Sequence, residues 1–326
     1  MKGLELSRLY YEQVGLPMLK RGFPAVLDRL AAGLVGEGSE CFGYDDEISR
    51  DHDYGPSFCL WLTEADYETV GPTLARAYAA LPGDFLGVPR RREEPYGTGR
   101  VGVLSTDAFY RRFLGLACPP ETAREWLFMN ENALAAATNG AVFSDPLGEF
   151  SGIRRAILGY YPEDVRRKKI AARAVTMAQA GQYNYARCMR RGESGAASLA
   201  LGEFVRAAVS MIYLLNRRYA PYYKWVFRAM EDLPSLVFLR DKLTRLTELP
   251  GQADCWPTED PMRYASRLNL RDPKVALVEE ICADVIRELK AQGLSDGDSD
   301  YLQTHGEAVM KRIGDPYLRS IPILGG

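Results

Sequence analysis

The sequence has few of the residues that bind zinc or form disulfide frameworks. It contains two histidines, His52 and His305, and six scattered cysteines with no Cys-x-x-Cys pair. Zinc sites and disulfide frameworks both need such residues at close, regular spacings. We therefore expect neither feature, and we expect the cysteines to be buried free thiols.

An excess of basic residues and a long apolar run are also lacking. The chain has 41 Lys and Arg against 43 Asp and Glu, a net charge of −2. Proteins that coat nucleic acid carry a clear basic excess, so nucleic acid is disfavoured as a partner. The most apolar run, over residues 204–215, is interrupted by Arg206 and is too short to span a bilayer, and the N-terminus lacks the apolar core of a secretory signal. We expect a cytoplasmic protein with no membrane partner.

A length of 326 residues with 47% apolar composition predicts two domains, each with its own core. The first half alternates helix-like and strand-like patterns, and the second half is almost entirely helical in pattern. These patterns predict an α/β or α+β module over residues 1–150, followed by a helical domain over residues 151–326. The boundary is expected near residues 148–151.

Local patterns predict the main elements of both domains. Helices are expected over residues 4–14, 25–32, 63–81, 194–216, 219–230 and 273–293. Strands are expected over residues 33–36, 58–62, 85–88 and 100–104.

The first chemical motif is Gly36-Glu37-Gly38-Ser39, directly after the first expected strand. Glycines at such a turn let backbone N–H groups approach an anion, and a serine hydroxyl adds another donor. The pattern alone is weak, because ordinary turns use the same residues. We interpret Gly36, Gly38 and Ser39 as a candidate phosphate cradle.

The second motif is Asp51-His52-Asp53, separated from Ser39 by eleven residues. On an extended strand, Asp51 and Asp53 would point the same way, and their charges would repel without a cation between them. Carboxylates together with substrate phosphates are the usual ligands of Mg²⁺. The two motifs together predict a site for Mg²⁺ and a nucleoside triphosphate. The alternative for Asp51 and Asp53 is an acidic surface loop.

The Gly-Ser, spacer and Asp-x-Asp arrangement resembles the signature of the polymerase-beta nucleotidyltransferase superfamily. More narrowly, the chain resembles a bacterial family of nucleotidyltransferase-like proteins known chiefly as a domain of unknown function. This likeness covers roughly residues 1–235. It is carried by residues 36–40, 45–56, 138–140 (Thr-Asn-Gly), 142–145 (Val-Phe-Ser-Asp), 191–193 (Arg-Gly-Glu) and 215–225 (Leu-Asn-Arg-Arg-Tyr-Ala-Pro-Tyr-Tyr-Lys-Trp).

The resemblance implies an α+β fold with a nucleotidyltransferase-type mixed sheet and flanking helices, followed by a C-terminal helical bundle. It implies Mg²⁺-dependent transfer of a nucleoside monophosphate, with ATP the favoured donor, to a hydroxyl or amine of a small molecule or protein. Pyrophosphate is the second product. Gly38 and Ser39 would match the residues that hold the triphosphate, and Asp51 and Asp53 would match two of three metal-binding carboxylates.

The expected third carboxylate is replaced by Gly102 in this sequence. Asp84, Asp107 or a residue from the helical half would have to substitute, or the second metal would bind weakly. The remaining alternative is a catalytically degenerate module that binds a nucleotide and regulates a partner.

Charged groups in the rest of the chain have two interpretations each. Glu203 shares a helical stripe with Arg206 and Ser210, which fits a buried ion pair or a catalytic general base. The basic runs at residues 90–92 and 166–169 fit contacts to phosphate or, more commonly, solvated faces.

Overall fold

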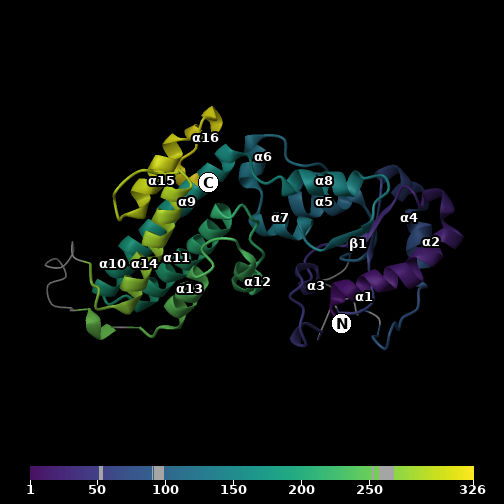
Figure 1. Cartoon of the computed structure of the whole chain (residues 1–326), viewed down its shortest axis with the longest axis horizontal. Helices are drawn as coiled ribbons and strands as arrows, with labels where there is room; N and C mark the ends of the chain where they lie inside the picture. Colours follow the sequence, from purple (N-terminus) through teal and green to yellow (C-terminus); the bar gives the residue numbers. More distant parts are fainter. Residues whose placement is uncertain (51–53, 90, 92–98, 252, 257–267) are drawn as a thin grey trace. The chain divides into compact units, whose positions relative to one another are not determined.

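The computed structural model in Figure 1 describes residues 1–50, 54–89, 91, 99–251, 253–256 and 268–326. The chain divides into two compact units. We call Met1–Glu121 with Met129–Tyr160 the sheet unit, and Thr122–Phe128 with Tyr161–Gly326 the helical unit. The division follows Tyr160, whereas the sequence placed it near residues 148–151. The later division arises because Phe150 stacks on Trp61 of the sheet, with ring centroids 3.9 Å apart.

The sheet unit contains a mixed four-stranded sheet in the order β3-β2-β1-β4. Strand β1 (Ala31–Leu34) is antiparallel to both β2 (Cys59–Leu62) and β4 (Ala141–Ser144), while β2 is parallel to β3 (Gly102–Ser105). Because β1 runs opposite to β2 and β3, it ends at the edge of the sheet where they begin. An α+β fold with a small mixed sheet is therefore confirmed.

Helices surround this sheet, and aromatic rings fill one side of its core. Tyr10 and Tyr11 lie 5.7 Å and 5.5 Å from the ring of Phe58, which is fully buried. The helices are α1 (Gly3–Tyr10), α2 (Leu16–Gly22), α3 (Ser39–Phe42), α4 (Glu64–Ala79), α5 (Thr106–Leu114), α7 (Glu131–Thr138) and α8 (Glu149–Leu158).

The local signals were reliable where a cap defined an element. The Thr63 hydroxyl accepts from the Asp66 N–H (3.2 Å) and begins α4 as expected. The helix expected over residues 25–32 is wrong, because only Pro24–Val26 makes a 3₁₀ turn before β1 begins. The expected strand at 85–88 is a single bridge between Phe85 and Val88. Strand β4 was not expected.

The described residues of the helical unit form helices and loops. Figure 1 shows α9, α11, α14 and α15 running side by side. The elements are α6 (Ala123–Phe128), α9 (Glu163–Met177), α10 (Ala186–Arg190), α11 (Ser194–Leu215), α12 (Tyr223–Ala229), α13 (Leu239–Glu248), α14 (Pro273–Ala291), α15 (Leu302–Lys311) and α16 (Pro316–Ser320).

Helix α11 is the most apolar helix in this unit. It extends ten residues before the apolar run at 204–215, so its 22 residues are long and apolar enough to cross a bilayer by length and composition. However, 56% of its 18-residue apolar window is buried in the protein. It packs along α9, as the core helix of a folded domain does.

Candidate functional site

The predicted phosphate cradle forms the turn between β1 and α3, and we call residues 36–39 the glycine loop. Gly36 has a φ of +143°, a conformation that side chains rarely adopt. Gly38 is extended, and a Cβ there would overlap the Glu40 carboxylate. The backbone therefore requires glycine at Gly36, whereas at Gly38 the absence of a side chain leaves room for the Glu40 carboxylate. Ser39 begins α3.

Asn139 holds the glycine loop in place. Its side-chain oxygen accepts from the Gly36 N–H (2.9 Å), and its amide donates to the Gly36 carbonyl (2.6 Å). The next residue, Gly140, has a φ of +60° and donates its N–H to the Cys41 carbonyl (2.8 Å). The Thr-Asn-Gly segment that supported the resemblance thus fixes the loop, a role that its composition did not reveal.

Two arginines converge on Glu37 within the glycine loop. Arg112 of α5 places Nη2 2.7 Å from Oε2 of Glu37, and Arg100 places Nε 3.3 Å from the same oxygen. They flank a small hollow lined by Val35, Gly36, Glu37, Gly99, Arg100, Phe109, Arg112 and Phe113. Its cavity volume is about 10 Å³, room for about one water. Sequence analysis missed both arginines, because neither lies in a recognisable motif.

A buried ion pair lies behind the same loop. Arg91 Nη1 is 3.1 Å from Oε1 of Glu40, and both side chains are at least nine-tenths buried. Gly55 makes this possible, since a Cβ there would come within 2.5 Å of the Arg91 backbone nitrogen. The expectation of a solvated face is therefore wrong for Arg91.

Asp51 and Asp53, the predicted metal ligands, lie outside the described residues. The described neighbour Tyr54 lies outside any strand, and β2 begins only at Cys59. The chain enters β2 at the edge of the sheet where β1 ends, which is the edge that carries the glycine loop. Across the described ranges, no group of three or more His, Cys, Asp or Glu side chains is arranged to hold a metal ion.

The position expected to carry a third carboxylate is a glycine for a backbone reason. Gly102 begins β3 opposite Cys59 with a φ of +102°. Any side chain there would be strained. Asp107 does not replace it, because it follows the other end of β3, in the first turn of α5. Asp84 lies exposed in the turn after α4.

Glu203 is exposed on α11, with 56% of its side chain accessible, and Oε1 lies 3.5 Å from Nη2 of the still more exposed Arg206. The expected buried ion pair is therefore wrong. Ser210 accepts a hydrogen bond from Arg173 Nε instead (2.9 Å). A catalytic role for Glu203 stays a prediction.

The basic run of α9 lies inside the helical unit rather than on a solvated face. Arg166 is 2% exposed and donates to the Leu214 carbonyl (3.0 Å), to Glu163 (3.0 Å) and to Gln292. Lys168 and Lys169 are also buried. The expectation of a solvated face is wrong for these three residues.

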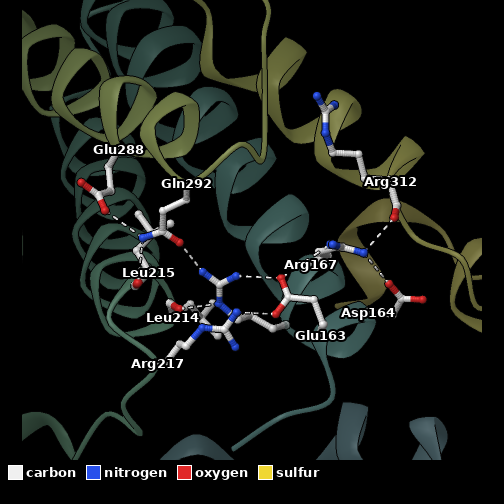
Figure 2. A network of polar contacts seen from close by, with 10 residues as sticks. Glu163, Asp164, Arg167, Leu214, Leu215, Arg217, Glu288, Gln292 and Arg312 are labelled. Carbon is white, nitrogen blue, oxygen red and sulfur yellow. Dashed lines mark hydrogen bonds and ion pairs between the residues drawn. The ribbon is translucent and has the colours of Figure 1, made fainter.

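Glu163 is the centre of this polar network (Figure 2). Its second oxygen accepts from Nη2 of Arg217 (2.6 Å), a residue in the left-handed region at φ +51° after α11. Arg167 donates to Asp164 (3.0 Å) and to the Arg312 carbonyl (3.1 Å). The contacts tie α9 to the end of α11 and to α14, which is a structural role.

Comparison with known proteins assigns one segment. A family described as a domain of unknown function (DUF4037) matches residues 126–226, which include Asn139 and Glu163 but neither the glycine loop nor Gln292 and Arg312 of the polar network. No curated protein and no solved structure matches the chain.

Proposed function

We propose that this protein is a Mg²⁺-dependent nucleotidyltransferase. It would transfer a nucleoside monophosphate, with ATP the favoured donor, to a hydroxyl or amine of a small molecule or protein and release pyrophosphate. The observation that carries the proposal is the glycine loop, held by Asn139 at the edge of the sheet where the chain enters β2. The resemblance of Gly38-Ser39 and Asp51-x-Asp53 to the superfamily signature supplies the reaction.

In this proposal each part of the sheet unit has a chemical task. The glycine loop binds the triphosphate, and Arg100 and Arg112 neutralise part of its charge. Asp51 and Asp53 would hold Mg²⁺, for which carboxylate oxygens are suitable ligands, and the bound ion would stabilise charge on the phosphate oxygens. The sheet unit would be the nucleotidyltransferase-type core, and the helical unit a bundle that binds the acceptor.

The test is pyrophosphate release from each nucleoside triphosphate with Mg²⁺, with mass spectrometry to find a nucleotidylated product or self-modified chain. Asp53→Asn should lower release by about two orders of magnitude or more, because it removes a metal-binding charge. Asp28→Asn removes the same charge from an exposed site and should leave the rate unchanged. Equal rates for Asp53→Asn and the native protein would exclude the assignment.

Gly102 favours a second candidate, a nucleotide-binding module without transfer. Its φ of +102° excludes an unstrained carboxylate at the position where the superfamily signature expects one. Calorimetry that shows binding of Mg²⁺ and ATP, without turnover across a panel of hydroxyl and amine acceptors, would support this alternative. A single nucleotidylated product would exclude it, and an absence of binding of every nucleoside triphosphate would exclude both candidates.

A further inference from the structure

The hollow beside the glycine loop is lined by Glu37, Arg100 and Arg112 among others. Arg100 and Arg112 both contact one oxygen of one carboxylate, that of Glu37. The nearby Arg91 and Glu40 form a buried pair of their own. Glu37 therefore contacts two guanidinium groups within the candidate phosphate site.

The three partners are not equally fixed. Arg112 also donates to the Gly99 carbonyl (3.1 Å) and lies over the Phe113 ring at 5.6 Å from the centroid. The side chains of Arg100 and Arg112 are 29% and 35% exposed, whereas that of Glu37 is 41% exposed. An exposed carboxylate gains little from its ion pair and can move into water at small cost.

We propose that Glu37 is a built-in competitor that occupies Arg100 and Arg112 until a polyphosphate displaces it. This inference rests on the proposed function, because it identifies the terminal phosphate of the nucleotide as the displacing group. A terminal phosphate carries more charge and more acceptor oxygens than one carboxylate, so it binds two guanidinium groups better. The hollow holds about one water with Glu37 in place, so the carboxylate must leave before a phosphate enters.

The experiment is calorimetric titration with inorganic tripolyphosphate, without metal and at low salt. Glu37→Gln removes the competing charge and should tighten binding about tenfold. Glu68→Gln removes the same charge from the exposed face of α4 and should leave affinity within about twofold of native. Arg112→Gln should weaken binding about tenfold.

A double variant separates displacement from a general change in charge. In the Arg112→Gln background, Glu37→Gln should gain less than about threefold, because Glu37 then competes for Arg100 alone. If Glu37→Gln does not fold, Glu37→Asp gives the same test, because its shorter side chain reaches the arginines poorly and should also tighten binding. Unchanged or weaker binding by the variant at Glu37, or an equal gain in Glu68→Gln, would overturn the proposal.

The titration needs neither nucleoside nor turnover, so the two proposals can fail separately. Tighter tripolyphosphate binding by Glu37→Gln in a protein that transfers no nucleotide would leave the competitor role intact. If the native protein transfers nucleotide but Glu37→Gln leaves the tripolyphosphate affinity unchanged, the competitor role of Glu37 is excluded while the proposed function stands.

Discussion

Burial determines how the thiols of this protein behave. Burial raises the pKa of Cys59 to about 12, and it also raises the pKa values of Cys41 and Cys282 well above the usual range for a thiol. The thiolate is the reactive form, so these three residues are chemically inert while the protein is folded. Two of them, Cys41 and Cys59, lie beside the glycine loop but supply no nucleophile.

A thiol-labelling experiment at pH 8 checks this. Cys118 is exposed and should react first, whereas Cys41, Cys59 and Cys282 should react only when the protein opens. Peptide mapping at successive times gives the order, and Cys118→Ser should remove the fast phase alone. Labelling of Cys59 together with Cys118 would contradict the burial of β2.

Glu279 should make stability depend on pH. Burial is the main cause that raises the pKa of Glu279, and the nearby charge of Asp300 adds to it, although the Gln182 amide donates to the carboxylate (2.7 Å). A raised pKa means that the folded state binds the proton more tightly than the unfolded state. The ionised carboxylate therefore costs folded-state stability, and this cost grows as pH rises from about 4 and levels off above the folded-state pKa.

The comparison is with Glu279→Gln, which keeps an acceptor for Gln182 but carries no charge. Its free energy of unfolding should exceed that of the native protein at pH 7, and the difference should vanish near pH 4. Denaturant titrations at both pH values measure it. If the native protein gains stability relative to the variant as pH rises, the predicted direction of the pH dependence is wrong.

At the scale of elements, the pairing of β1 with β4 depends on glycine at one position. Gly140 has a φ of +60°, and a Cβ there would overlap the Leu34 carbonyl of β1. Gly43 has a similar φ of +76° but open space around it. The two positions therefore separate backbone strain from steric overlap.

Gly43→Ala should cost about 1–2 kcal/mol, the penalty for a left-handed residue. Gly140→Ala carries the same strain and adds overpacking, so it should cost about 2–5 kcal/mol. Chemical denaturation of both variants measures the difference. Equal losses would mean that β4 shifts away from β1 without cost, against the pairing described for Leu34 and Ala141.

Sequence patterns predicted the elements that have local signals such as helix caps. They did not predict the features that depend on contacts between residues far apart in the chain. Helix α14 begins as expected at Pro273, because Asp272 caps it with a hydrogen bond to the Lys274 N–H (2.8 Å). Strand β4 has only four residues, and their composition does not predict that they pair with β1. The glycine loop was found because Gly36-x-Gly38-Ser39 is a local sequence pattern, whereas Asn139 binds it from 103 residues away.

At the scale of the whole molecule, two units with separate cores should lose structure separately. Arg166 is the residue on which to test this, because it joins α9, α11 and α14 through the Leu214 carbonyl and Gln292. The sequence could not distinguish its buried role from a solvated one, because burial depends on helices that pack from distant parts of the chain.

Arg166→Met fills the same space but leaves the Leu214 carbonyl and the Gln292 side chain without this donor. We expect the helical unit to lose about 2–4 kcal/mol, since each buried polar group left without its partner is costly. Arg206→Met, at a side chain that is 79% exposed, should change stability by less than about 0.5 kcal/mol.

Hydrogen exchange with mass spectrometry reports the two units separately. Amides of α9, α11 and α14 should exchange faster in Arg166→Met, while those of β1 and β2 keep their native rates. Equal acceleration in β1 and β2 would show that the sheet unit and the helical unit unfold as one, against a division into two cores.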